Sequence, residues 1–277
     1  MESFFSLLER RVDDCSSLLC VGLDPHPDDL KARAAAEAQS FCIALVRATA
    51  PYAAAFKPNA AFFEIYGAEG WVALKHVIDA VGEESQRRGS HIPVILDAKR
   101  GDIASTAQAY ASAAFDSLGA DAITVSPYLG GDSVEPLLRN PEKGAFLLCK
   151  TSNPGSGDLQ DLRIQGEDGQ SQALYLRVAS LARAWNAHQN LGLVVGATFP
   201  DTLREIRAAA PGLWILAPGI GAQGGELEAA MQAGLRTDAM GLLISVSRGI
   251  SRAPDPAAAA AELRDLIAEI RRAQKRR

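Results

Sequence analysis

Eight short apolar runs, separated by longer segments with helical patterns, constrain the fold of this chain more than any other feature. Short runs that are apolar throughout are typical of strands buried on both faces of a parallel sheet. The runs are Leu18–Leu23, Ala54–Lys57, Val94–Asp97, Ala122–Val125, Ala145–Cys149, Leu193–Gly196, Trp214–Ala217 and Gly241–Val246. The sequence therefore predicts eight buried strands.

The segments between these runs carry the amphipathic spacing of helices. The clearest helical face comprises Leu263, Leu266, Ile267 and Ile270. Strands that alternate with helices eight times favour an α/β protein with a closed (β/α)8 TIM barrel, formed as a single domain by residues 1–277. The segment Glu2–Val12 is predicted to be an extra N-terminal helix. An open, Rossmann-like sheet is the alternative.

Polar residues gather where the apolar runs end, which is where barrel enzymes place their active sites. They are Asp24, Lys57, Asp97, Lys99, Ser126, Thr151, Ser152, Thr198, Gly219, Ser247 and Arg248. The polar interval Asn153–Gln172 is long enough to be a substrate lid at this rim, although a plain surface insertion explains it nearly as well.

The charge and composition exclude several classes of protein. A net charge of -5 argues against a general nucleic-acid binder, and the basic cluster from Arg271 to Arg277 is predicted to be a solvated helix end. No apolar run approaches the roughly 20 residues that span a bilayer, and the first residues lack a secretory pattern, so we expect a soluble, cytoplasmic protein.

No metal site is evident in the sequence. The four cysteines, Cys15, Cys20, Cys42 and Cys149, form no CxxC pair, and we expect buried, reduced thiols. The four histidines, His26, His76, His91 and His188, have no metal-binding spacing either.

The segment Ile95–Thr106 is the most informative for chemistry. Asp97 and Lys99 are two residues apart at the end of a predicted strand, so their side chains are expected on the same face. Lys57 ends the neighbouring strand, which makes an alternating array of Lys57, Asp97, Lys99 and Asp102 feasible. Because desolvating such ions costs several kcal/mol, stability alone is a poor reason to build the array, although a structural ion-pair network remains an alternative.

Six short motifs follow one another between about Leu19 and Ile250. They are Val21–Asp24, Phe56–Asn59, the Asp97-x-Lys99-x-x-Asp102-Ile103-x-x-Thr106 run, Thr151–Gly155, Ala217–Gly225 and Ser247–Ile250. Together they resemble the orotidine 5'-phosphate decarboxylase family, in its longer-chain branch. The Asp-x-Lys-x-x-Asp run alone is moderately specific, but all six motifs in this order are highly specific.

The resemblance implies a role for each motif residue. Lys57, Asp97 and Lys99 are expected in the site of their own subunit, and Asp102, with Ile103 and Thr106, in the site of the partner subunit. The expected substrate-binding residues are Asp24 at the ribose, Ser152 at the pyrimidine, Gln223 and Arg248 at the phosphate, and Pro218 and Ser247 in the same two segments.

The resemblance also implies the activity, which is conversion of orotidine 5'-phosphate to UMP and CO2 in UMP biosynthesis. It implies a homodimer that needs neither a cofactor nor a metal, with Lys99 as the proton donor. Two enzyme alternatives stay open: a magnesium-dependent barrel relative, for which Glu64 is the nearby candidate glutamate, and a Schiff-base aldolase using Lys57 or Lys99. A nucleotide-binding protein without activity is a third, and the intact tetrad argues against it.

Two further motifs are weak. Gly219–Gly224 fits the dinucleotide-binding pattern G-x-G-x-x-G, but it follows the seventh predicted strand and no acidic residue ends a later strand at the required spacing. Arg100-Gly101-Asp102 reads as a cell-adhesion tripeptide, which the position at a barrel rim makes improbable.

Overall fold

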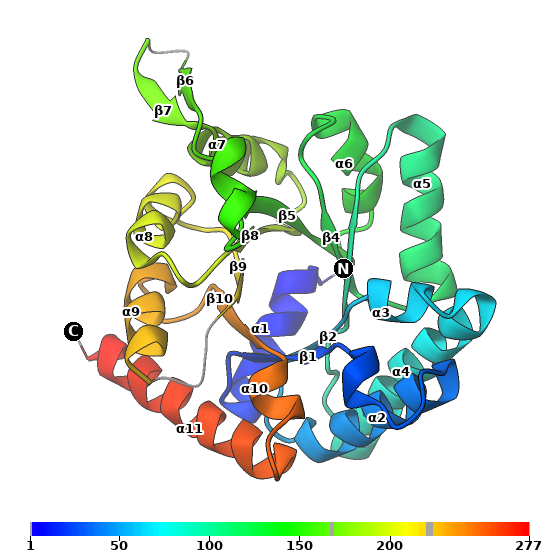
Figure 1. The fold of residues 1–277 in the computed structure, drawn as a ribbon. Helices are drawn as coiled ribbons and strands as arrows, with labels where there is room; N and C mark the ends of the chain where they lie inside the picture. Colours follow the sequence, from blue (N-terminus) through cyan, green and yellow to red (C-terminus); the bar gives the residue numbers. More distant parts are fainter. Residues whose placement is uncertain (1, 167–168, 220–223, 277) are drawn as a thin grey trace.

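A closed parallel β-barrel forms the centre of the molecule in the computed structural model, which describes residues 2–166, 169–219 and 224–276 (Figure 1). The strand order is β2-β1-β10-β9-β8-β5-β4-β3, and bridges between Phe56 and Val94 and between Asn59 and Asp97 join β2 to β3. The strands are β1 (Leu19–Leu23), β2 (Ala55–Pro58), β3 (Ile95–Arg100), β4 (Ala122–Val125), β5 (Gly144–Lys150), β8 (Leu191–Val195), β9 (Ile215–Pro218) and β10 (Leu242–Val246). All eight predicted runs overlap these strands, and the closure excludes the open, Rossmann-like sheet.

Helices surround the barrel (Figure 1). The long ones are α2 (Ala35–Thr49), α4 (Gly67–Arg88), α5 (Ala104–Ser112), α6 (Gly131–Leu138), α7 (Leu174–Trp185), α8 (Pro200–Ala209), α9 (Gly224–Gly234) and α11 (Pro256–Lys275). Short turns of helix are α3 (Ala61–Glu64) and α10 (Arg248–Ser251), with η1 (Pro27–Asp29), η2 (Ala113–Ser117) and η3 (Pro154–Asp158). The strands and the inner faces of the helices share one hydrophobic core.

The predicted N-terminal helix is α1 (Phe4–Cys15), and it closes the amino end of the barrel. Ser3 caps it by accepting a hydrogen bond from the amide of Ser6. The Phe5 ring stacks on Trp214 and meets Phe146 edge to face. A side chain at Gly144 would place its Cβ 2.4 Å from the Phe4 ring, so β5 needs glycine here for α1 to pack against it.

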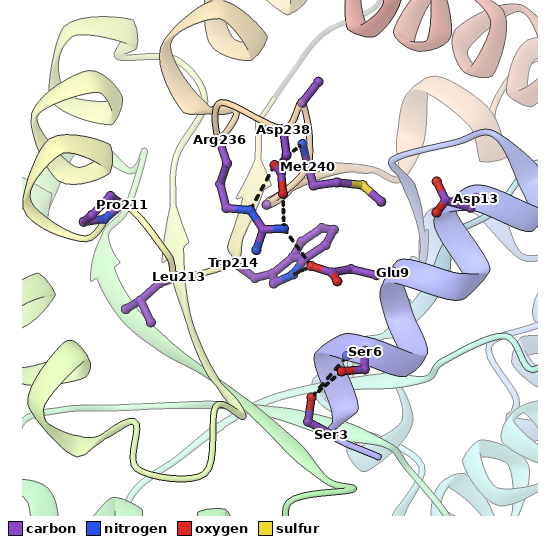
Figure 2. Close-up of polar contacts among 12 residues, drawn as sticks. Ser3, Ser6, Glu9, Asp13, Pro211, Leu213, Trp214, Arg236, Asp238 and Met240 are labelled. Carbon is purple, nitrogen blue, oxygen red and sulfur yellow. Dashed lines mark hydrogen bonds and ion pairs between the residues drawn. The ribbon is translucent and has the colours of Figure 1, made fainter. Parts of the chain in front are cut away.

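Polar contacts fix α1 to the loop that precedes β10 (Figure 2). The Arg236 guanidinium lies between the carboxylates of Glu9, at 2.7 Å, and Asp238, at 2.8 Å. The Trp214 indole N–H donates to Glu9, and Arg236 also lies over the Trp214 ring. These polar groups are hydrogen-bonded to one another, as expected for a contact whose role is structural.

One sequence-based expectation needs correction. Arg271 is not part of a solvated helix end, because it is 8% exposed and donates to the Ala239 carbonyl at 2.9 Å. Arg271 lies on the buried face of α11, which could not be recognised in the sequence because charged residues stand next to it. The polar interval 153–172 contains a β-hairpin that was not predicted, β6 (Arg163–Gln165) with β7 (Ser171–Ala173), which projects from the barrel beside α7 (Figure 1).

The expected buried thiols are confirmed, since all four cysteines are free and buried. No helix in the described part of the chain combines the length and the apolar character needed to cross a membrane.

Candidate active site

Three charged side chains meet at the carboxyl end of β2 and β3. Lys57 donates to one oxygen of Asp97 at 2.9 Å, and Lys99 donates to the other at 2.7 Å. The side chains of Lys57 and Asp97 are 8% and 11% exposed, whereas that of Lys99 is 51% exposed. The predicted lysine–aspartate–lysine array therefore exists, with a buried pair behind a lysine that is open to solvent.

The sequence spacing alone does not explain how Lys99 reaches Asp97. The pairing of β3 with β4 shifts between Leu96 and Arg100, and Lys99 has a left-handed backbone with φ of 47°. The β-bulge is held by Thr124 on β4, whose hydroxyl accepts from the amides of Ala98, at 3.1 Å, and Lys99, at 3.0 Å. Bulges and strained residues of this kind are frequent beside active sites.

Thr124 is a site residue that the sequence analysis missed. It is 2% exposed, and its hydroxyl donates to the Asp97 carboxylate at 2.9 Å. Asp97 thus accepts from three donors while buried, which fixes its orientation. A threonine inside an apolar strand gave no signal, because Val, Ile and Thr are all ordinary strand residues.

The ion pairs favour the charged forms of the two buried members of the array, Asp97 and Lys57. Burial alone would raise the pKa of the Asp97 carboxyl, but the charges and hydrogen bonds of Lys57 and Lys99 hold it well below its usual range. Burial alone would lower the pKa of Lys57, but the carboxylates of Asp97 and Asp24 raise it above its ordinary value. The site therefore holds a fixed negative charge next to a cation exposed to an incoming molecule.

Two further rim residues carry buried oxygens without a hydrogen-bond partner in the described structure, Oδ1 of Asp24 and Oγ of Ser247. Asp24 follows β1 and Ser247 follows β10, so both lie at the carboxyl end of neighbouring strands. A side chain at Gly22 would lie 2.7 Å from the Ser247 Cβ, so glycine allows this close approach. Unpaired buried oxygens are costly, and a substrate with hydroxyl groups could satisfy them.

The predicted cross-subunit residues do not join the array within one chain. The Asp102 carboxylate accepts from the amide of Ile103 at 2.8 Å and forms no ion pair with Lys57 or Lys99. Ile103 is 55% exposed, and Thr106 on α5 is exposed as well. The three side chains are therefore available to a neighbouring molecule.

The remaining predicted binding residues follow β5, β9 and β10. Ser152 is exposed and packs against Gly196, where a Cβ would lie 2.9 Å from its own. Pro218 ends β9, and Arg248 begins α10 with an exposed side chain. The prediction for Gln223, like most of the Gly219–Gly224 motif, falls outside the described residues.

Glu64 and Arg100 pair with each other. From the sequence, Glu64 is a candidate glutamate of a magnesium-dependent enzyme, and Arg100 is part of a tripeptide that reads as a cell-adhesion motif. Arg100 forms an ion pair with Glu64 on α3 and lies over the Tyr110 ring. Glu64 is thus engaged with the guanidinium of Arg100, the last residue of β3. Across the described ranges, no group of three or more His, Cys, Asp or Glu side chains could hold a metal ion.

A closed parallel barrel with a charged array at its carboxyl rim defines an α/β-barrel enzyme. The chain belongs to the orotidine 5'-phosphate decarboxylase / HUMPS family, whose profile it matches over residues 17–263. The orotidine 5'-phosphate decarboxylase of Roseiflexus castenholzii is 49% identical over 276 residues, which cover 96% of this chain and 97% of that protein.

Solved structures give the same result. The structure of the Leishmania donovani OMP decarboxylase superimposes with a TM-score of 0.86 at 54% identity, covering 98% of this chain and 99% of that one. The Leishmania donovani UMP synthase superimposes with a TM-score of 0.87 at 56% identity, and the match covers 98% of this chain and 57% of that one. The family resemblance inferred from the motifs is therefore confirmed.

Proposed function

We propose that this chain decarboxylates orotidine 5'-phosphate at the array of Lys57, Asp97 and Lys99, by direct chemistry that needs no metal or cofactor. The activity follows from the family, whose relatives carry the name of this carboxy-lyase, and it is the last step of UMP biosynthesis. The observation that carries the residue assignment is the Asp97 carboxylate, buried and charged, directly beside the exposed Lys99 ammonium. In this proposal, residues 1–277 form one catalytic domain.

The reaction breaks the bond between C6 of the pyrimidine and its carboxylate. CO2 leaves, and the electron pair stays on C6 as a carbanion. The Lys99 ammonium stabilises this charge and then donates a proton to C6, giving UMP, and the neutral lysine regains a proton from water. The position of Lys99 is fixed by the Thr124 hydrogen bond to its amide and by the ion pair with Asp97, so little reorganisation accompanies charge development.

Asp97 has a different role from Lys99. Its charge lies where the substrate carboxylate would approach, so loss of CO2 relieves repulsion between two anions. Lys57 and Thr124 keep Asp97 ionised and oriented, which makes them positioning residues. A carboxylate with an ordinary pKa could avoid the repulsion by taking up a proton. Asp97 resists protonation, because Lys57 and Lys99 lower its pKa.

Binding of the rest of the substrate is assigned to the other rim residues. The unpaired oxygen of Asp24 fits a ribose hydroxyl as a donor, and exposed Ser152 fits the pyrimidine edge. The Arg248 guanidinium is suited to a phosphate, which it can bind through two parallel hydrogen bonds. Because the phosphate lies far from C6, its binding energy can be used to orient the reacting carbon.

We also propose that the protein works as a homodimer in the cytoplasm, with Asp102, Ile103 and Thr106 completing the site of the partner subunit. Support comes from their surroundings, since Asp102 pairs with neither lysine of the array within one chain and both Ile103 and Thr106 are exposed. An exposed isoleucine at 55% is consistent with a contact outside the chain.

The activity is tested by mixing purified protein with orotidine 5'-phosphate in excess EDTA and following the loss of the orotate chromophore. We expect turnover to survive exhaustive chelation. Recovery of turnover only after addition of magnesium would instead favour the metal-dependent barrel relatives. Trapping with borohydride and a ketose phosphate separates the Schiff-base aldolase, which would leave a covalent adduct on a lysine.

The shared site is tested by complementation between two inactive variants, Lys57→Ala and Asp102→Ala. Each homodimer has every site damaged once, whereas a mixed dimer has one intact site and one with both lesions. Activity should return on mixing, at the rate of subunit exchange measured by mass spectrometry, and should reach about half that of wild type per heterodimer. Exchange without recovery of activity would place Asp102 in its own subunit's site.

A further inference from the structure

A buried lysine at the end of β5, Lys150, has no part in the chemistry assigned above. Its side chain is 6% exposed, and its ammonium forms an ion pair with Asp161 at 2.7 Å. It also donates to the Ser156 hydroxyl at 3.1 Å. Both partners belong to the segment 153–161, which follows the proposed pyrimidine contact, so Lys150 is bound to the middle and to the end of this loop.

Lys150 also connects this loop to the next one around the rim. Its ammonium lies 5.9 Å from the centre of the Phe199 ring, at the start of α8. Its carbonyl accepts from the amide of Gly196, just after β8, at 2.7 Å. The residue therefore fixes the loop after β5 against the loop after β8.

A second set of contacts anchors the residue between Lys150 and Ser152. The Gln160 side chain accepts from the Thr151 amide at 2.8 Å and donates to the Thr151 hydroxyl at 2.9 Å. Ser152 thus directly follows two residues that are each bound to the far end of the loop. Its own side chain stays exposed, packed against Gly196.

The pairing of β5 with β8 shifts between Leu148 and Lys150, as the pairing of β3 shifts before Lys99. Two of the rim strands thus carry an irregularity directly before their functional residues. A buried lysine costs free energy that its ion pair at best offsets, so stability alone does not account for it. Fixing a loop that contacts substrate does account for it, because a preorganised contact loses less entropy on binding.

We propose that Lys150 is a positioning residue for pyrimidine recognition, which holds the 153–161 loop through Ser156 and Asp161 and thereby orients Ser152 toward the base. This inference rests on the role of Ser152 proposed above. It assigns Lys150 to substrate recognition, separately from the proton donor Lys99 and from the phosphate ligand Arg248.

The test compares Lys150→Met, Ser152→Ala and the double variant in binding to UMP and to ribose 5-phosphate, which lacks the base. Loss of one neutral hydrogen bond predicts UMP affinity about fivefold lower in each single variant, with ribose 5-phosphate affinity unchanged within about twofold. Because Lys150 acts through Ser152, the double variant should bind UMP no more weakly than Ser152→Ala. The KM for orotidine 5'-phosphate should rise more than kcat falls, since Lys57, Asp97 and Lys99 are intact.

Three outcomes would overturn the inference. They are additive losses in the double variant, equal losses for UMP and ribose 5-phosphate, and wild-type UMP affinity in Lys150→Met. If Ser152→Ala alone binds UMP like wild type, the assignment of Ser152 to the base is wrong, and the inference fails with it, while decarboxylation by the wild type still stands.

Asp161→Asn gives a second, milder test that does not depend on the folding of Lys150→Met. Asp161 is 52% exposed, so its loss should leave the fold intact and lower UMP affinity about two- to threefold. Asp158→Asn is the matched control, because it removes a carboxylate from the same loop that forms no ion pair with Lys150 in the described structure. Equal effects of the two asparagine variants would contradict the role of the Lys150–Asp161 pair.

Discussion

The two ends of the barrel both bury cations, but they satisfy them in opposite ways. At the amino end the buried cations are arginines, and most of their partners are main-chain carbonyls. Arg207 donates to the carbonyls of Gly234, Ala210, Pro211, Leu213 and Gly241. Arg11 donates to Ala50 and Ala53. At the carboxyl end the buried cations are lysines paired with carboxylates, Lys57 with Asp97 and Lys150 with Asp161.

The pKa shifts follow this difference. Burial, with the nearby charge of Arg236, lowers the pKa of Arg207 to about 10, and burial lowers that of Arg11 below its ordinary value. The Lys57 pKa is raised, because the charges of Asp97 and Asp24 and the hydrogen bond to Asp97 together outweigh burial. Arginine at the amino end fixes loops and helices through main-chain carbonyls, whereas the buried lysines of the rim are held by carboxylates. The comparison predicts that rim substitutions reduce activity and amino-end substitutions reduce stability.

Lys99→Ala should show the largest effect. Loss of both the proton donor and its electrostatic stabilisation should lower kcat by about 10⁴-fold or more, while UMP binding stays measurable. The unfolding midpoint should change little because Lys99 is half-exposed. Steady-state kinetics and thermal unfolding measure both, with Lys75→Ala on the surface of α4 as the control. Near-normal turnover in the folded variant would remove Lys99 from the mechanism.

Arg248→Ala should come next, with binding of orotidine 5'-phosphate weakened by about 3 kcal/mol, the loss expected when a charged pair loses one partner. Orotidine, which has no phosphate, should be turned over almost equally by the variant and the wild type. Arg252→Ala is the control, since Arg252 lies one turn further and pairs with Asp29. The same loss with both substrates would show that Arg248 does not bind the phosphate.

Arg207→Met should show the reverse pattern at the amino end. Five carbonyls lose their donor, so the free energy of unfolding in urea should fall by about 2–4 kcal/mol, while kcat/KM of the folded protein stays within about twofold of wild type. Arg204→Met on the same helix is the control, because Arg204 is exposed and pairs only with Asp201 among the described residues. Loss of activity at unchanged stability would break the contrast between the two ends.

The smallest effect concerns the pH dependence of stability at Asp121, at the amino end of β4. Burial would raise the pKa of this carboxyl, but hydrogen bonds and charges from His91 and Lys143, with the Val94 amide, lower it. A lowered folded pKa contributes stability above the unfolded pKa of about 3.9, and this contribution is lost as pH falls toward the folded value. Asp121→Asn should therefore flatten the fall of unfolding free energy between about pH 5 and 3. Exposed Asp201→Asn should leave that fall unchanged.

Much of the site could be predicted from the sequence because it lies at strand ends. The apolar runs locate the strands, and polar residues at or just after the end of a run are then assigned to the rim, as for Asp24, Lys57 and Ser247. Thr124 could not be found in this way, and the contacts of Lys150, which directly follows the run Ala145–Cys149, could not be foreseen. Thr124 is an ordinary strand residue in sequence, and the ion pair of Lys150 depends on how the 153–161 loop folds back.

The sequence by itself determined the strand–helix alternation, the carboxyl rim as the site and the identity of its charged residues, because these depend on local periodicity and on the order of strands. Only the tertiary structure decided which of them touch. Lys57 reaches Asp97, 40 residues away, because β2 pairs with β3 where the barrel closes. Lys99 reaches it through a bulge that Thr124 holds, and Arg271 is buried because α11 packs against the amino end. Contacts between distant residues depend on closure and packing, which no local pattern encodes.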